Sequence, residues 1–215
     1  MPFTETTPKV MVKVNGKPLL EWVLRWLGAH EVRNIVLGVA HLKESVMNHF
    51  RDGARLGLSI RYSEHTVEGG TAQGFRLGIS RYVDDEDFLA LNGDQVTNLD
   101  VQRLARFHAK HRPVATIAVT RPNIPFGQIK MNRTQEITRF VEKPIAPFYC
   151  NMGIYAFNKS ILEYLNETGD IEKTMFPILA AKKKLKAYIH KGHFITVNTP
   201  KDLAEAEREL ADVVD

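Results

Sequence analysis

The sequence is poor in cysteine, with Cys150 alone among 215 residues, so no internal disulfide can form. It also lacks a basic segment followed by an apolar run near its start, which is the pattern of a secretory signal. Charged residues interrupt every apolar stretch well short of the ~20 residues that cross a bilayer. These absences predict a cytoplasmic protein with no membrane-spanning segment.

Several motifs that carry chemistry are missing as well. There is no pair of cysteines, no His-x-x-x-His and no G-x-S-x-G, and the eight histidines are dispersed along the chain. This disfavours a zinc site or a serine nucleophile. Neither G-x-G-x-x-G nor G-x-x-x-x-G-K-[ST] occurs, which excludes the Rossmann dinucleotide and P-loop fingerprints.

The charge balance is mildly basic, with 29 Lys and Arg against 25 Asp and Glu and a pI of about 9.1. The one dense run, "KKKLK" at 182–186, follows a helical pattern and suits a helix C-terminus. Because no stripe of basic and aromatic residues is present, we expect no nucleic-acid partner. A small basic excess does suit a protein that handles phosphorylated small molecules.

The first part of the chain alternates between two apolar periodicities. Helical spacing occurs at 18–30, 42–50, 71–82 and 99–111, and strand-like runs occur at 34–40, 58–63, 87–94 and 114–120. Alternation of this kind predicts an α/β fold with three layers, Rossmann-like, around a mostly parallel sheet.

The rest of the chain is richer in strand patterns. "FGQIKMN" and "EITRFVEK" predict a hairpin, and "FYCNMGIYAFN" predicts another strand. Helices are expected at 159–166 and 171–183, two short strands around Lys191-Gly192, and a closing helix from Pro200. No linker or repeat divides the chain, so we expect a single domain, 1–215, with a small strand-rich extension.

Three short segments hold candidate site residues. In "LALNGDQV", Asp94 follows Gly93 at the end of a strand, where it could ligate Mg²⁺ on a phosphate or simply form a turn. "VEGGTAQG" (67–74) is a glycine-rich bend into a helix, which suits an anion or a base edge, or only a turn. In "TRFVEKP", Glu142 and Lys143 could bind a sugar hydroxyl and a phosphate, or form an exposed ion pair.

Each segment is weak alone, but their order is specific. "TETTPKVMVKVNGKPLLEWVL", "EGGTAQG", "LNGD", "FGQIK…ITRFVEKP", "NMGIYAF" and "FITVNTPKDLAEAE" follow one another along the chain. In this order they resemble the sugar-phosphate nucleotidyltransferases over nearly the whole sequence, and most of all the compact enzymes that make NDP-glucose or GDP-mannose.

The resemblance implies a reaction and a set of residues. A sugar 1-phosphate oxygen would attack the α-phosphorus of an NTP, with Mg²⁺ as cofactor and pyrophosphate as leaving group. Residues to about 120 would bind the nucleotide, and about 121–215 the sugar phosphate. The implied residues are Lys9, Asp94 and Lys143 for catalysis, Glu68, Gly70, Thr71, Asn92 and Gly93 for the nucleotide, Gly127, Glu142, Lys143 and Asn151 for the sugar phosphate, and Asp94 and Asn198 for the metal.

Two departures from the family pattern matter. Where the family often has W-x-D-x-G-T-P, this chain reads "FITVNTP", with Thr196 at the Asp position; Asn198 would ligate through its amide or cap a helix. The family pattern also begins with a strand and a glycine-rich loop, A-x-I-L-A-G-G-x-G-T-R-L-x-P-L-T, ahead of the part matched by "TETTPK". Without that strand, we expect long unpaired edges in the sheet.

These departures keep a second interpretation open, a non-catalytic sugar-nucleotide-binding or regulatory paralogue. The substrates implied are an NTP and a sugar 1-phosphate, while the base and the sugar stay undecided. Homo-oligomers are a further possibility, with the strand-rich second half as the expected interface.

Overall fold

The computed structural model describes residues 7–197, 202–204 and 206–208. The helices are α1 (Leu19–Ala29), α2 (Lys43–Phe50), α3 (Gly70–Tyr82), α4 (Val101–His111) and α5 (Ile171–Ala181), with 3₁₀ turns η1 (Lys9–Met11), η2 (Ala54–Leu56) and η3 (Lys159–Glu163). The strands are β1 (Lys13–Val14), β2 (Lys17–Pro18), β3 (Asn34–Val39), β4 (Ser59–Glu64), β5 (Asp87–Leu91), β6 (Gln95–Thr97), β7 (Ala115–Thr120), β8 (Gln128–Met131), β9 (Ile137–Val141), β10 (Cys150–Asn158), β11 (Leu185–Ile189) and β12 (Phe194–Thr196).

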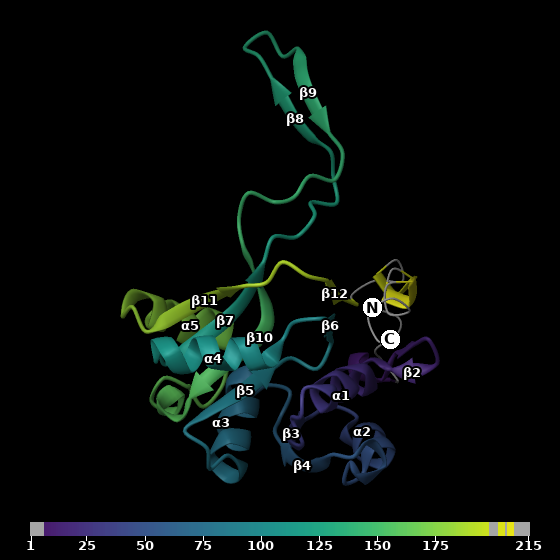
Figure 1. The fold of residues 1–215 in the computed structure, drawn as a ribbon, viewed down its shortest axis with the longest axis vertical. Helices are drawn as coiled ribbons and strands as arrows, with labels where there is room; N and C mark the ends of the chain where they lie inside the picture. Colours follow the sequence, from purple (N-terminus) through teal and green to yellow (C-terminus); the bar gives the residue numbers. More distant parts are fainter. Residues whose placement is uncertain (1–6, 198–201, 205, 209–215) are drawn as a thin grey trace.

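A four-stranded sheet in the order β11-β7-β10-β5 forms the centre of the molecule (Figure 1). β10 runs antiparallel to β7 and β5, and β11 runs parallel to β7, so this sheet is mixed. The three-layer α/β prediction is confirmed, because helices cover both faces of β10.

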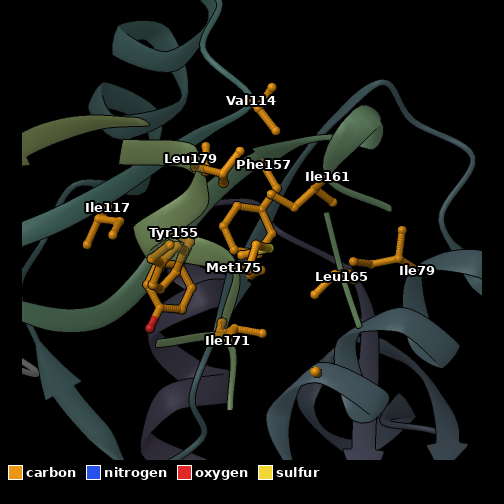
Figure 2. Packing of buried hydrophobic residues seen from close by; sticks show 14 residues of the cluster. Ile79, Val114, Ile117, Tyr155, Phe157, Ile161, Leu165, Ile171, Met175 and Leu179 are labelled. Atoms are coloured by element: carbon orange, nitrogen blue, oxygen red, sulfur yellow. The ribbon is translucent and has the colours of Figure 1, made fainter. Parts of the chain in front are cut away.

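Successive side chains of β10 point to opposite faces of the sheet, which explains those layers. Tyr155 and Phe157 point to the face covered by α5 and α3, where they pack with Met175 and Leu179 (Figure 2). The alternate residues, including Ile154, pack with α4 on the opposite face. A strand buried on both faces needs a continuous apolar run, and "MGIYAF" supplies one.

The strands β3 and β4 form a separate parallel pair, packed with α1 and α2. In the residues described, β3 pairs only with β4, and β5 pairs only with β10. One edge of each strand therefore carries no strand partner within this part of the chain.

The hairpin predicted at 126–143 is confirmed as β8–β9, and it extends far from the rest of the molecule (Figure 1). We call residues 121–149 the arm. On one face of its hairpin, Ile129 pairs with Phe140 and Met131 with Ile137, and all four side chains are exposed.

Three local predictions need correction or lie outside the structure. The helix expected at 159–166 is the shorter 3₁₀ turn η3. The run 182–186 only partly follows a helix, since α5 ends at Ala181 and Leu185 already begins β11. The closing helix falls partly on residues outside those described.

Candidate functional site

A cavity of about 900 Å³ separates the two unpaired strand edges. Its apolar lining comes from α1, α3, β3 and β5, including Leu24, Leu37, Ile79 and Ala90. Polar side chains line it where β5 ends, namely Lys9, Asn92 and Asp94. In open α/β sheets, ligands bind at this carboxyl end of the strands.

Lys9 and Asp94 form the charged centre of the site. The Lys9 ammonium lies 2.5 Å from the Asp94 carboxylate, and the two side chains are 32% and 24% exposed. Lys9 begins η1 directly after Pro8, and Asp94 follows β5. Gly93, between the strand and Asp94, is packed against Leu20 and Val10, where a β-carbon would make ordinary contacts at 3.4 Å. An accessible carboxylate beside an ammonium can hold a cation and a phosphate side by side.

Asn92 is held against the middle of β10. Its backbone N–H donates to the Gly153 carbonyl at 2.9 Å. Gly153 has a φ of +68°, and a β-carbon there would overlap the Gln95 side chain. The Asn151 side chain accepts from the Gly153 N–H at 2.7 Å and donates to the Tyr155 hydroxyl at 2.9 Å. Asn92, predicted to bind the nucleotide, and Asn151, predicted to bind the sugar phosphate, are thus both hydrogen-bonded to the backbone of Gly153.

The glycine-rich bend before α3 is fixed by a second glycine loop. The Gly169 N–H donates to the Gly69 carbonyl at 3.0 Å, and the Ala72 N–H donates to the Gly169 carbonyl at 2.8 Å. Gly70 has a φ of +61°, and a β-carbon there would lie 2.6 Å from the Gly169 carbonyl oxygen. The conformation of the bend is therefore fixed by backbone hydrogen bonds to Gly169, and its glycines are required for this close backbone contact.

The sequence interpretation missed two residues of this site, Tyr155 and Glu172. The Glu172 carboxylate accepts from the Thr71 hydroxyl and from the Tyr155 hydroxyl, each at 3.5 Å. Burial raises the pKa of Tyr155, and the nearby Glu172 and Asp94 carboxylates raise it further, against the hydrogen bond from Asn151. Tyr155 is thus a neutral hydroxyl donor. An acidic residue in the first turn of a predicted helix was the only available signal for Glu172.

The remaining predicted residues lie elsewhere. Gly127, Glu142 and Lys143 belong to the arm, where Glu142 and Lys143 are exposed. In the described part of the chain, no hydrogen bond or ion pair connects these two side chains to Asp94. Glu68 is exposed in the bend before α3, and Asn198 lies outside the described residues.

Among the residues described, no three His, Cys, Asp or Glu side chains gather as a metal-binding group. No helix in the same ranges is long and apolar enough to cross a membrane.

The comparisons of sequence agree on one family. The model of the family described as "Nucleotidyl transferase" matches residues 1–213. A mannose-1-phosphate guanyltransferase from Yarrowia lipolytica is 34% identical over 94% of this chain and 58% of its own length, so the chain spans less than two thirds of that relative.

Two crystal structures share the fold. A putative glucose-1-phosphate thymidylyltransferase from Bacillus anthracis, in complex with a sucrose, has a TM-score of 0.78 at 19% identity and covers 99% of this chain and 90% of its own. HddC from Yersinia pseudotuberculosis, complexed with GMP-PN, has a TM-score of 0.74 at 20% identity and covers 94% and 90%.

Proposed function

The chain belongs to the nucleotidyl transferase family, and from this premise we propose that it transfers a guanylyl group from GTP to mannose 1-phosphate. In this reaction an oxygen of the sugar phosphate forms a bond to the α-phosphorus of GTP. The bond between the α-phosphorus and the bridging oxygen breaks, and pyrophosphate leaves. The choice of base and sugar comes from the relative in Yarrowia lipolytica.

The observation that carries this proposal is the Lys9–Asp94 pair at the carboxyl end of β5. Phosphoryl transfer needs its two anionic reactants positioned and neutralised rather than a covalent intermediate on the protein. In our proposal Lys9 faces the phosphates, Gly70 and Thr71 meet the base, and Asn151 contacts the sugar phosphate. HddC, which shares the fold, is complexed with GMP-PN, and this supports nucleotide binding in general.

Asp94 fits a magnesium ion in this scheme. Mg²⁺ binds through one or two carboxylates and substrate phosphates and keeps several waters, so it needs no dense protein cluster. The partly exposed Asp94 carboxylate meets that requirement. When bound, Mg²⁺ would neutralise phosphate charge, and the ammonium of Lys9 would then turn from Asp94 to the phosphates.

The test is pyrophosphate release in the presence of Mg²⁺. Release that requires both GTP and mannose 1-phosphate supports the proposal. The choice of base is tested by pairing UTP, dTTP or CTP with mannose 1-phosphate. The choice of sugar is tested by pairing GTP with glucose 1-phosphate. Absence of release with every pair, from a folded protein, would contradict transferase activity in this chain.

The cavity between β3 and β5 favours a second candidate, binding of a sugar nucleotide without turnover. No described segment fills the place where the family resemblance puts a strand and a phosphate-holding loop. At a site of developing charge, each preorganised donor contributes ~3 kcal/mol, about a hundredfold in rate. Calorimetry that detects GDP-mannose binding while pyrophosphate release is absent would select this candidate.

A further inference from the structure

Glu172 lies in the first turn of α5, next to residues with proposed roles on both substrates. Its two carboxylate oxygens meet different hydroxyls, Thr71 on one side and Tyr155 on the other, both at 3.5 Å. Thr71 belongs to the proposed base site, and Tyr155 carries the hydrogen bond from Asn151. Glu172 therefore lies between the two parts of the site.

The local hydrogen bonds leave both hydroxyl protons available to the Glu172 carboxylate. The Thr71 hydroxyl oxygen accepts from the Ile171 N–H at 3.0 Å, so its own proton remains for Glu172. The Tyr155 oxygen likewise accepts from Asn151 at 2.9 Å. Gly169, beside α5, is joined to the bend before α3 by two backbone hydrogen bonds. These backbone contacts hold the start of α5, and with it Glu172, beside the bend before any ligand binds.

Glu172 nevertheless keeps most of its capacity to accept hydrogen bonds. Both of these contacts are at the long limit for hydrogen bonds to a carboxylate, which ordinarily are shorter than 3 Å. A carboxylate offers about four acceptor positions, and the residue is exposed to solvent. Donors from a ligand can therefore reach it.

The charges around Glu172 select the kind of donor. Among the described residues, no cation lies within ion-pair distance of Glu172, because the neighbouring Lys173 pairs with Asp170 at 2.7 Å. Lys173 therefore acts on Glu172 only at longer range. A carboxylate without an ion pair repels phosphate, so the phosphates belong beside Lys9 instead. The ligand group that can lie against Glu172 is uncharged and rich in hydroxyls.

We infer that Glu172 binds hydroxyls of the sugar ring of the sugar 1-phosphate and so contributes to the choice of sugar. This inference rests on the proposed function and adds a residue to its site. A sugar without those hydroxyls would leave the Glu172 carboxylate covered and unpaired, which is an effective way to reject a ligand.

The experiment compares how tightly GDP-mannose and GDP bind, by calorimetry, to the wild type, to Glu172→Gln and to Glu167→Gln. The ratio of the two dissociation constants isolates the contribution of the sugar. Glu172→Gln should reduce the preference for GDP-mannose about tenfold, because charge-assisted hydrogen bonds are replaced by neutral ones. Glu167 is an exposed residue five positions earlier, and no hydrogen bond or ion pair among the described residues joins its side chain to the site, so Glu167→Gln should leave the ratio unchanged.

Each other outcome overturns the inference in a recognisable way. Equal weakening of GDP and GDP-mannose would place Glu172 on the ribose or in support of Thr71. An unchanged ratio in Glu172→Gln would show that the sugar does not contact Glu172. A wild type that binds GDP and GDP-mannose equally well would show the same. A wild type that binds neither ligand overturns the proposed function together with the inference. Thermal unfolding of the variants checks that the exposed substitution has left the fold intact.

Discussion

Asp94 is the residue on which the proposed chemistry depends most. It is the carboxylate beside Lys9 at the end of β5, and a neutral amide in its place holds Mg²⁺ far less well. We expect Asp94→Asn to remove most of the gain in GTP affinity that Mg²⁺ confers, and to lower pyrophosphate release about a hundredfold. The measurement is calorimetry of GTP with and without Mg²⁺, followed by the release assay.

Asp85→Asn is the matched control for this prediction. Asp85 is exposed and lines the same cavity near the start of β5, two residues before the strand begins. The same chemical change there should leave the effect of Mg²⁺ intact. If both variants lose the Mg²⁺ effect equally, the loss comes from the overall charge of the cavity, and Asp94 is not the ligand.

At the residue scale, the sequence predicted the parts of the site that follow a strand or a glycine bend. Asp94 and Thr71 were found because a strand end and a glycine-rich turn have recognisable patterns, although their roles came from the family resemblance. Glu172 and Tyr155 were missed because their importance arises from contacts between residues that are far apart in the sequence. Glu172 lies 101 positions after Thr71 and 17 positions after Tyr155. Such contacts depend on how α5 packs against β10, which no local pattern reports.

At the scale of the elements, the bend before α3 is sensitive to substitution of its glycine at position 70. Gly70→Ala meets two penalties, a positive φ of +61° and a β-carbon 2.6 Å from the Gly169 carbonyl oxygen. Gly57→Ala meets only the first, since its φ is +68° and nothing lies within 4 Å of the added atom. Strain of this kind costs ~1–2 kcal/mol.

Urea unfolding of both variants tests this reasoning. We expect Gly57→Ala to lose roughly 1 kcal/mol of stability and Gly70→Ala distinctly more, because overlap with backbone must be relieved by moving the Gly169 loop. Gly70→Ala should also weaken GTP binding, whereas Gly57→Ala should not. Equal losses of stability would show that the Gly169 loop moves freely and does not fix the bend.

The elements were easier to predict than their pairing. Apolar periodicity placed α1, α3 and α4 close to their observed bounds, and strand-rich composition placed the hairpin β8–β9. Asp100 caps α4 by accepting from the Arg103 N–H at 3.0 Å. Periodicity does not show strand direction, so it could not show that β10 inserts antiparallel between β7 and β5. It also could not show how far the arm extends from the sheet.

At the scale of the whole molecule, the cavity between β3 and β5 divides the protein into two packed parts. β3 packs with α1, α2, α3 and β4, while β5 belongs to the four-stranded sheet with β10, and α3 also packs against that sheet. Apolar side chains from both parts face the cavity of about 900 Å³. An extended apolar segment placed there could pair with both free edges and bury its side chains on both faces.

This geometry predicts the effect of adding such a segment. A variant with the strand and loop A-x-I-L-A-G-G-x-G-T-R-L-x-P-L-T ahead of residue 1 should unfold at higher urea concentration than residues 1–215. Its unfolding should also depend more steeply on urea, since more apolar surface is buried in the native state.

The control carries the same extension with Asp and Ser in place of its Ile and Leu strand residues, which cannot fill an apolar cavity. If both extensions leave the midpoint unchanged, the strand does not enter the cavity. A rise with the apolar extension alone, accompanied by faster pyrophosphate release, would show that one added strand joins the two parts and completes the phosphate site.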